Sequence, residues 1–121
     1  MTVVDNLYSG HRWAVPPTAD FHQLDAGDEP AMSSLLRQQR SDAVIHFAGH
    51  IVVPESIADP AKYYRNNVVA SLNLIRACCA SGVRYFIFSS SAAVYGDPEQ
   101  VPVAEHHPTI PINPYGRTKL I

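Results

Sequence analysis

The residues most capable of chemistry are a tyrosine and a lysine four positions apart, Tyr115 and Lys119. Residues with this spacing share one face of a helix, so a phenol and an ammonium group can act together. A free phenol has a pKa of about 10 and is a weak base at neutral pH, but a neighbouring positive charge favours the phenolate. With the hydroxyl of Ser91, which ends an earlier apolar run, the pair predicts a site that takes a proton from a hydroxyl group.

Short apolar runs alternate with helical patterns along the chain, and these elements must position the pair. We predict strands at 1–4, 21–24, 43–48 and 85–88, the last a continuous apolar run that implies burial on both faces. A helix is predicted from Pro30 to Arg40, followed by a long amphipathic crossover helix from Pro60 to Ser81, capped by Asp59. The apolar stripe of this second helix comprises Tyr64, Val68, Leu72, Ile75 and Cys79.

Strands separated by helices indicate an α/β fold with a parallel sheet. The residues from Gly96 to Pro114 show no clear periodicity, and a loop of this length is usually functional. In such a fold ligands bind beyond the carboxyl ends of the strands, where the notable residues lie: Asp5, Asn6, Asp25, Gly49 and Ser89 to Ser91. A carboxylate that ends the second strand of a dinucleotide-binding half favours NAD over NADP. Asp5 has this role if its strand is that second strand, although an aspartate after a strand is also a common first residue of a loop.

Composition narrows the class of protein. The 121 residues fit one domain, and the scattered charges, with a formal net charge of −2, give no footprint for nucleic acid or an anionic membrane. The adjacent Cys78 and Cys79 suit a reducing compartment, and without a leader or a long apolar run we predict a cytoplasmic protein. His46 and His50 do not converge on a strand and its loop, so we predict no metal site.

An ordered set of motifs covers essentially the whole chain. It comprises residues 3–7, 9–10, 42–49, 54–56, 63–67, 86–96 and 113–119. Together these motifs resemble the extended short-chain dehydrogenase/reductase family, specifically its NAD-dependent nucleotide-sugar epimerases. The resemblance implies a Rossmann-like, doubly wound parallel sheet, with residues 1–121 forming a partial NAD-binding domain.

The resemblance also implies roles for individual residues. Ser91, Tyr115 and Lys119 are the implied catalytic residues; Ser91 and Tyr115 hold the sugar, and Tyr115 and Lys119 also bind the nicotinamide ribose. The remaining implied NAD-binding residues are Asp5, Asn6, Ser9, Gly10, Asp25, Ala26, Phe47, Ala48, Gly49 and Asn66.

The implied reaction is the interconversion of UDP-glucose and UDP-galactose. Tyr115 removes the C4 hydroxyl proton, hydride passes to NAD, and the 4-keto sugar takes the hydride back on its other face. Related dehydratases and decarboxylases carry carboxylates just after the equivalent of Ser91, whereas this chain has Ala92 and Ala93 there. The resemblance therefore favours epimerisation over elimination.

Several family features are expected outside this sequence. A first strand with a Gly-rich turn should precede Met1, and the region that binds the uridine nucleotide should follow Ile121, so the sheet is predicted to be incomplete. His50 and Ile51 also stand where many relatives have a lysine. We expect an internal fragment that is inactive alone, from a protein whose full-length relatives form homodimers. Two alternatives stay open: another nucleotide-sugar epimerase, and a non-enzymatic truncated chain.

Overall fold

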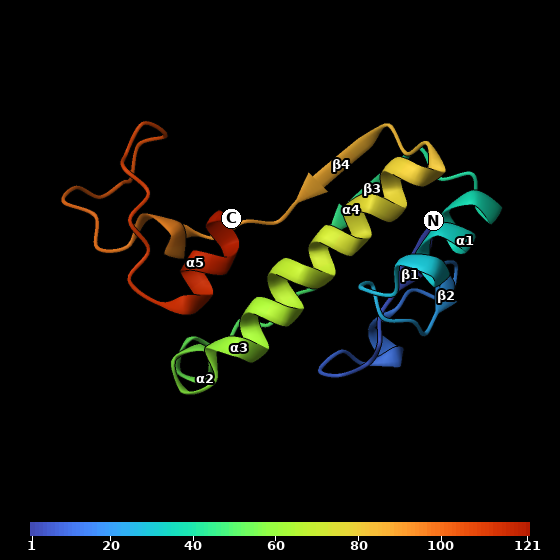
Figure 1. Ribbon diagram of the computed structural model, residues 1–121, viewed down its shortest axis with the longest axis horizontal. Helices are drawn as coiled ribbons and strands as arrows, with labels where there is room; N and C mark the ends of the chain where they lie inside the picture. The colour runs from blue at the N-terminus through green and yellow to red at the C-terminus, as the bar shows by residue number, and fades with distance from the viewer. The chain divides into compact units, whose positions relative to one another are not determined.

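The computed structural model describes residues 1–121, which form two compact units (Figure 1). The first comprises residues 1–48 and 70–87, and the second comprises residues 49–69 and 88–121. No helix is both long enough and apolar enough to cross a membrane.

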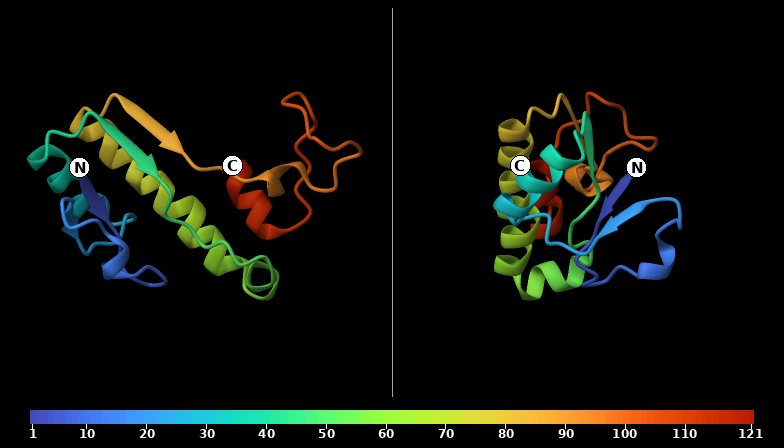
Figure 2. Two further views of the ribbon diagram at one scale, coloured as in Figure 1. Left: turned by 180° about the vertical axis from the view of Figure 1, so that it is seen from behind. Right: turned by 90° about the vertical axis from the view of Figure 1, so that its right-hand side faces the viewer.

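Two pairs of strands form the sheet structure. Strand β1 (Thr2–Val4) pairs in parallel with β2 (Asp20–His22), with Val3 opposite Phe21. Strand β3 (Ala43–His46) pairs with β4 (Tyr85–Phe88), and the two run in the same direction (Figure 2). A 3₁₀ turn (Arg12–Ala14) lies between β1 and β2. The predicted α/β class and parallel strands are confirmed, with the sheet limited to these two pairs.

The core of the first unit lies between two helices and the strands. Helix α1 (Glu29–Gln38) begins where the side chain of Asp28 accepts a hydrogen bond from the Ala31 N–H, and α4 (Ala70–Ser81) is followed by Gly82 with φ +76°. Glycine adopts this left-handed conformation without a Cβ penalty. The buried core residues are Met32, Leu36, Leu74, Ala77 and Cys78.

Two burial predictions were wrong. Tyr85 and Ile87, which share one face of β4, are 61% and 55% exposed, because in this chain only the face that carries Phe86 packs against the core. The predicted apolar stripe is also mostly exposed: Leu72, Ile75 and Cys79 remain open to solvent. Helix α4 instead buries a neighbouring stripe, Ser71, Leu74, Ala77 and Cys78.

The second unit contains four short helical elements and one 3₁₀ turn. They are α2 (Val53–Ala58), α3 (Pro60–Tyr63), a π-helical segment (Tyr64–Val69), the 3₁₀ turn (Ala92–Tyr95) and α5 (Pro114–Leu120). The side chain of Asp59 caps α3 as predicted, accepting a hydrogen bond from the Lys62 N–H at 3.0 Å. The helical stretch from Pro60 to Ser81 is not uniformly α-helical, because the π-helical segment interrupts the predicted pattern.

Candidate active site

Helix α5 carries both residues of the tyrosine–lysine pair. It starts at Pro114, where the side chain of Asn113 accepts a hydrogen bond from the Gly116 N–H at 2.8 Å. The Tyr115 N–H donates to the hydroxyl of the fully buried Ser56 in α2, at 3.2 Å. The start of the helix is therefore fixed both by its own cap and by a second helix.

The turn that follows Ser91 packs closely against α5. The Ser91 hydroxyl accepts a hydrogen bond from the Ala93 N–H at 3.2 Å and so caps the 3₁₀ turn. A Cβ added at Gly116 would lie 2.5 Å from the carbonyl oxygen of Ala93, so only glycine allows this approach. The absence of a side chain at Gly116 thus brings the serine's turn against the helix that carries the tyrosine.

Lys119 is only 6% exposed, although it is a charged residue. Its ammonium nitrogen Nζ donates to the Ser89 carbonyl at 2.9 Å and lies 4.9 Å from the centre of the Phe88 ring. Burial lowers the pKa of Lys119 below its ordinary value. The hydroxyl of Ser90 donates to the Lys119 carbonyl at 3.1 Å, so the serine segment and α5 are joined at the lysine's side chain and backbone.

Gly49, in the loop after β3, also lies close to Lys119. A Cβ on Gly49 would lie 3.4 Å from the Lys119 Nζ and 3.4 Å from the side-chain oxygen of Asn67. Asn66, which the sequence singled out, is partly exposed and donates to the Asn67 oxygen at 2.9 Å. The second unit therefore contains Gly49, Asn66, Ser91, Tyr115 and Lys119 of the predicted residues, and Gly49 lies close to Lys119 and to the Asn67 side chain that Asn66 contacts.

Sequence reasoning missed Asn67, which is buried and bonded to the backbone of His50 and to the Thr118 hydroxyl. Two consecutive asparagines inside an apolar helical pattern were the available signal. The sequence does not distinguish Asn66 from Asn67, whereas in the structure only Asn67 is buried.

A second cluster fixes the loop after Gly49. The fully buried Tyr63 donates its hydroxyl proton to the Val52 carbonyl at 2.7 Å, accepts from the Val52 N–H and also contacts Glu55. Burial, with the Glu55 contact, raises the pKa of Tyr63, and the hydrogen bond from Lys62 lowers the pKa of Glu55. The pKa of His50, whose ring lies 5.5 Å from the Tyr63 ring, is lowered by burial and by Lys62. This cluster supports the backbone and shows no reactive arrangement of its own.

The predicted adenosine-side residues lie in the first unit. Asp5 follows β1, and its carboxylate accepts from the Leu7 N–H at 2.6 Å, in a turn where Leu7 has φ +59°. Asn6 accepts from the Tyr8 N–H, and a Cβ on Gly10 would lie 2.7 Å from the Asp5 carboxylate. Asp5 and Gly10 are thus brought together, whereas Ser9 is exposed beside them.

The remaining predicted residues follow β2 and β3. Asp25 accepts from the Gly27 N–H at 2.8 Å, and Ala26 packs against the core of the first unit. Phe47 is 73% exposed and Ala48 is exposed too. Phe47 and Ala48 were predicted within the strand at 43–48, but β3 ends at His46, so both lie in the loop that follows it.

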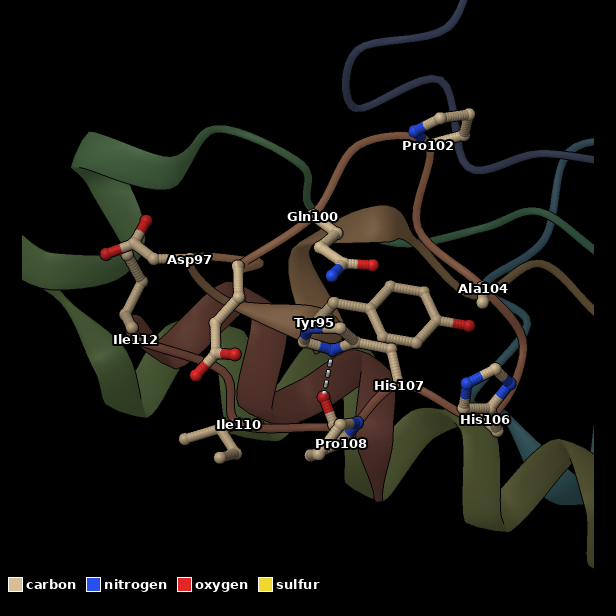
Figure 3. Close-up of a pocket in the computed structure, with 11 residues that line it drawn as sticks. Tyr95, Asp97, Gln100, Pro102, Ala104, His106, His107, Pro108, Ile110 and Ile112 are labelled. Atoms are coloured by element: carbon tan, nitrogen blue, oxygen red, sulfur yellow. Dashed lines mark hydrogen bonds between the residues drawn. The ribbon is translucent and has the colours of Figure 1, made fainter.

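A hollow of about 450 Å³ lies within the long loop, lined by residues between Tyr95 and Ile112 (Figure 3). The rings of Tyr95 and His107 meet edge-on at 5.8 Å, and a His107 nitrogen is bonded to the Pro108 carbonyl at 2.8 Å (Figure 3). None of the predicted catalytic residues lines this hollow, so we assign it no chemistry. The structure also contains no group of three or more His, Cys, Asp or Glu side chains that could hold a metal ion.

Comparisons with known proteins give consistent results. The model of the family described as "NAD dependent epimerase/dehydratase family" matches residues 1–121. A UDP-glucose 4-epimerase of Lactobacillus helveticus is 50% identical over 119 residues, which is 98% of this chain and 36% of that protein. One of Azospirillum brasilense is 49% identical over 118 residues, which is 98% of this chain and 34% of that protein. The chain therefore spans about a third of the length of these relatives.

Solved structures show the same likeness. UDP-glucose 4-epimerase from Brucella ovis in complex with NAD superposes with a TM-score of 0.95 at 46% identity, covering 98% of this chain and 36% of that one. The UDP-Glc/GlcNAc 4-epimerase from Campylobacter jejuni gives a TM-score of 0.90 at 44% identity, covering 98% of this chain and 38% of that one. The predicted Rossmann-like fold is thereby confirmed.

Proposed function

Because this chain belongs to the NAD dependent epimerase/dehydratase family, we propose that it contributes to the interconversion of UDP-glucose and UDP-galactose. The relatives described above from Lactobacillus helveticus and Azospirillum brasilense are UDP-glucose 4-epimerases. The reaction inverts C4 of the sugar after transient oxidation. These 121 residues carry the proton-transfer part of that chemistry and part of the cofactor site.

The observation that carries this proposal is the fixed placement of α5 against the serine segment. Tyr115 takes the C4 hydroxyl proton, and Ser91 holds that hydroxyl. The buried ammonium of Lys119 supplies the positive charge that favours a phenolate one helical turn away. Its hydrogen bond to the Ser89 carbonyl, at 2.9 Å, holds the ammonium nitrogen in place.

The residues present fit NAD as the cofactor, which when bound supplies the hydride acceptor. In the first unit, the absence of a side chain at Gly10 lets the Asp5 carboxylate approach the backbone there, and Asp5 would meet the adenosine ribose. Asn6, Ser9, Asp25 and Ala26 would complete the adenosine side. In the second unit, Gly49 leaves space beside Lys119, and with Asn66, Tyr115 and Lys119 it would serve the nicotinamide side. Phe47 and Ala48, in the loop after β3, would line the cofactor's far ribose and its phosphates.

A second substrate class is supported by the Campylobacter jejuni structure, whose printed description includes GlcNAc as well as Glc. A UDP-N-acetylhexosamine is therefore the alternative substrate. A cytoplasmic location and a homodimer belong to the same proposal, the former supported by the unbonded Cys78 and Cys79.

A hybrid enzyme tests the proposal. The matching segment of the Lactobacillus helveticus epimerase is replaced by this chain, and the conversion of UDP-galactose or UDP-N-acetylgalactosamine is followed by NMR. We expect conversion of UDP-galactose, with kcat reduced about 10²- to 10⁴-fold by Tyr115→Phe. Tyr85→Phe, an exposed tyrosine on β4, is the matched control and should leave kcat unchanged.

Two outcomes would contradict this proposal, and a third would select the other substrate class. A hybrid that binds NAD but converts neither sugar would contradict an epimerase role for this segment. Equal activity of the Tyr115→Phe and unaltered hybrids would remove Tyr115 from the mechanism. Preference for the N-acetylated sugar would select the second substrate class.

A further inference from the structure

The first turn of α5 contains a backbone donor for which the helix itself offers no acceptor. The earliest N–H groups of a helix lack intrahelical partners. Pro114 has no N–H, and the Gly116 N–H donates to the Asn113 side chain at 2.8 Å. The N–H of Tyr115 lies between them and donates to the hydroxyl of Ser56 in α2, at 3.2 Å. The backbone of the proposed catalytic tyrosine is therefore held by a residue distant in the chain.

Ser56 can only accept in this contact, because its own proton is used elsewhere. The residue is fully buried, and its hydroxyl donates to the Val53 carbonyl at 2.7 Å. A hydroxyl has one proton and two acceptor lone pairs, so what remains for Tyr115 is an acceptor position. Removal of the hydroxyl would leave the Tyr115 N–H without its protein acceptor.

Helix α2 is itself fixed at its start by α3. The fully buried Tyr63 bonds both the N–H and the carbonyl of Val52, the residue that precedes α2, at 2.9 and 2.7 Å. The Glu55 carboxylate of α2 lies 2.9 Å from the Tyr63 hydroxyl and accepts a hydrogen bond from Lys62. Ser56 therefore belongs to an element whose position is set by buried contacts.

The other end of α5 has separate anchors. The Lys119 Nζ donates to the Ser89 carbonyl at 2.9 Å, and the Ser90 hydroxyl donates to the Lys119 carbonyl at 3.1 Å. Helix α5 has only seven residues, and helices this short are marginal without tertiary support. Contacts outside the helix therefore decide where each end lies, and at the Tyr115 end one of these contacts is the Ser56 hydroxyl.

We propose that Ser56 is a positioning residue, whose hydroxyl holds the Tyr115 backbone and so sets where the phenol lies relative to Lys119. The proposal rests on the proposed function for its catalytic meaning. Its structural content is a local dependence of the Tyr115 backbone on the Ser56 hydroxyl, which is measured without catalysis.

Hydrogen exchange of the Tyr115 amide provides that measurement. The chain contains six tyrosines, so selective ¹⁵N-tyrosine labelling of the 121-residue chain gives six amide signals, and the signal lost in Tyr115→Phe is that of Tyr115. The Tyr64 amide donates to the Pro60 carbonyl in the same unit and is the internal reference. Ser56→Ala removes the hydroxyl, and Ser56→Cys replaces it with a thiol, which is a weak acceptor.

We expect exchange of the Tyr115 amide to become about 10-fold faster in Ser56→Ala, with a smaller change in Ser56→Cys and no change at Tyr64. In the hybrid enzyme, Ser56→Ala should lower kcat about 10-fold with a smaller change in KM, because a displaced phenol impairs proton transfer more than binding. A serine that only stabilised the second unit would instead speed exchange at Tyr115 and Tyr64 alike.

Ser71→Ala is the matched control. Ser71 is also buried, and its hydroxyl is bonded to the His46 ring at 2.7 Å, but both residues belong to the first unit. This variant should leave the exchange of the Tyr115 amide and kcat unchanged.

The exchange data decide the proposal even if the hybrid enzyme converts no sugar, so its failure is distinguishable from that of the proposed function. Unchanged Tyr115 exchange in a folded Ser56→Ala chain overturns it, as does equal acceleration at Tyr115 and Tyr64. If Ser56→Ala does not fold, as judged by circular dichroism, Ser56→Cys carries the comparison. In an active hybrid, an unchanged kcat in Ser56→Ala also overturns it.

Discussion

Replacing Gly116 by alanine should weaken the contact that joins α5 to the turn after Ser91. The new Cβ would lie 2.5 Å from the Ala93 carbonyl oxygen and 3.0 Å from the Cβ of Pro111. Both atoms belong to, or are held by, the backbone, so neither can rotate away. Overpacking of this kind costs about 1–3 kcal/mol, and the gain from alanine over glycine within a helix is at most about 1 kcal/mol. We therefore expect a net loss of about 1 kcal/mol in the free energy of unfolding.

Urea denaturation followed by circular dichroism measures this loss, and kcat of the hybrid enzyme measures its effect on the site. Displacement of α5 should lower kcat about 10- to 100-fold. Gly82→Ala is the control: it has open space around it but φ of +76°, so it should lose stability through its backbone conformation while leaving kcat unchanged. An alanine at 116 that stabilises the chain, as alanine does in an open helix, would refute the close-packing argument.

Three further predictions concern other parts of the chain. Asp5→Ala should abolish NAD binding measured by calorimetry, whereas replacement of the exposed Asp20 by alanine should not; equal binding by both variants would exclude Asp5 from the cofactor site. Burial lowers the pKa of Lys119 in the folded chain below 10.5, its ordinary value. Between the folded-state pKa and 10.5 the unfolded chain therefore binds more protons, so the free energy of unfolding should rise with pH in this range. An unchanged slope of that free energy against pH in Lys119→Met would contradict this. Iodoacetamide should modify the exposed Cys79 before Cys78, whose pKa is raised by burial, and mass spectrometry of the two single alanine variants would reveal the reverse order if it occurred.

Local sequence signals predicted the helix starts and β4 well. Asp59 and Pro60 form a helix start that depends only on neighbouring residues, and the continuous apolar run of Tyr85–Phe88 matches β4 at both ends. The second strand was displaced, since β2 begins at Asp20 and ends at His22, within a polar and weakly patterned stretch. Element type was therefore predictable wherever the signal was local.

Burial and the supporting network were not predictable in the same way. The stripe through Leu72 and Ile75 is apolar at helical spacing, but which stripe of α4 is buried depends on where α1 packs. The π-helical segment leaves no mark in a pattern of apolar spacing, and neither does the choice between Asn66 and Asn67. The candidate residues Ser91, Tyr115 and Lys119 were proposed from the sequence, whereas some of the atoms that hold their segments belong to residues distant in the chain, such as Ser56.

The central claim is that Tyr115 takes the C4 hydroxyl proton while the hydrogen on C4 leaves as hydride and the same hydrogen returns on the other face. The most direct test of this claim uses UDP-galactose labelled with deuterium at C4. The hybrid enzyme is incubated with this substrate in ordinary water, and the UDP-glucose formed is analysed by mass spectrometry and NMR. We predict that the product retains deuterium at C4 and that its formation is lost with Tyr115→Phe. Product carrying solvent hydrogen at C4, or formed equally fast by the Tyr115→Phe variant, would contradict the account.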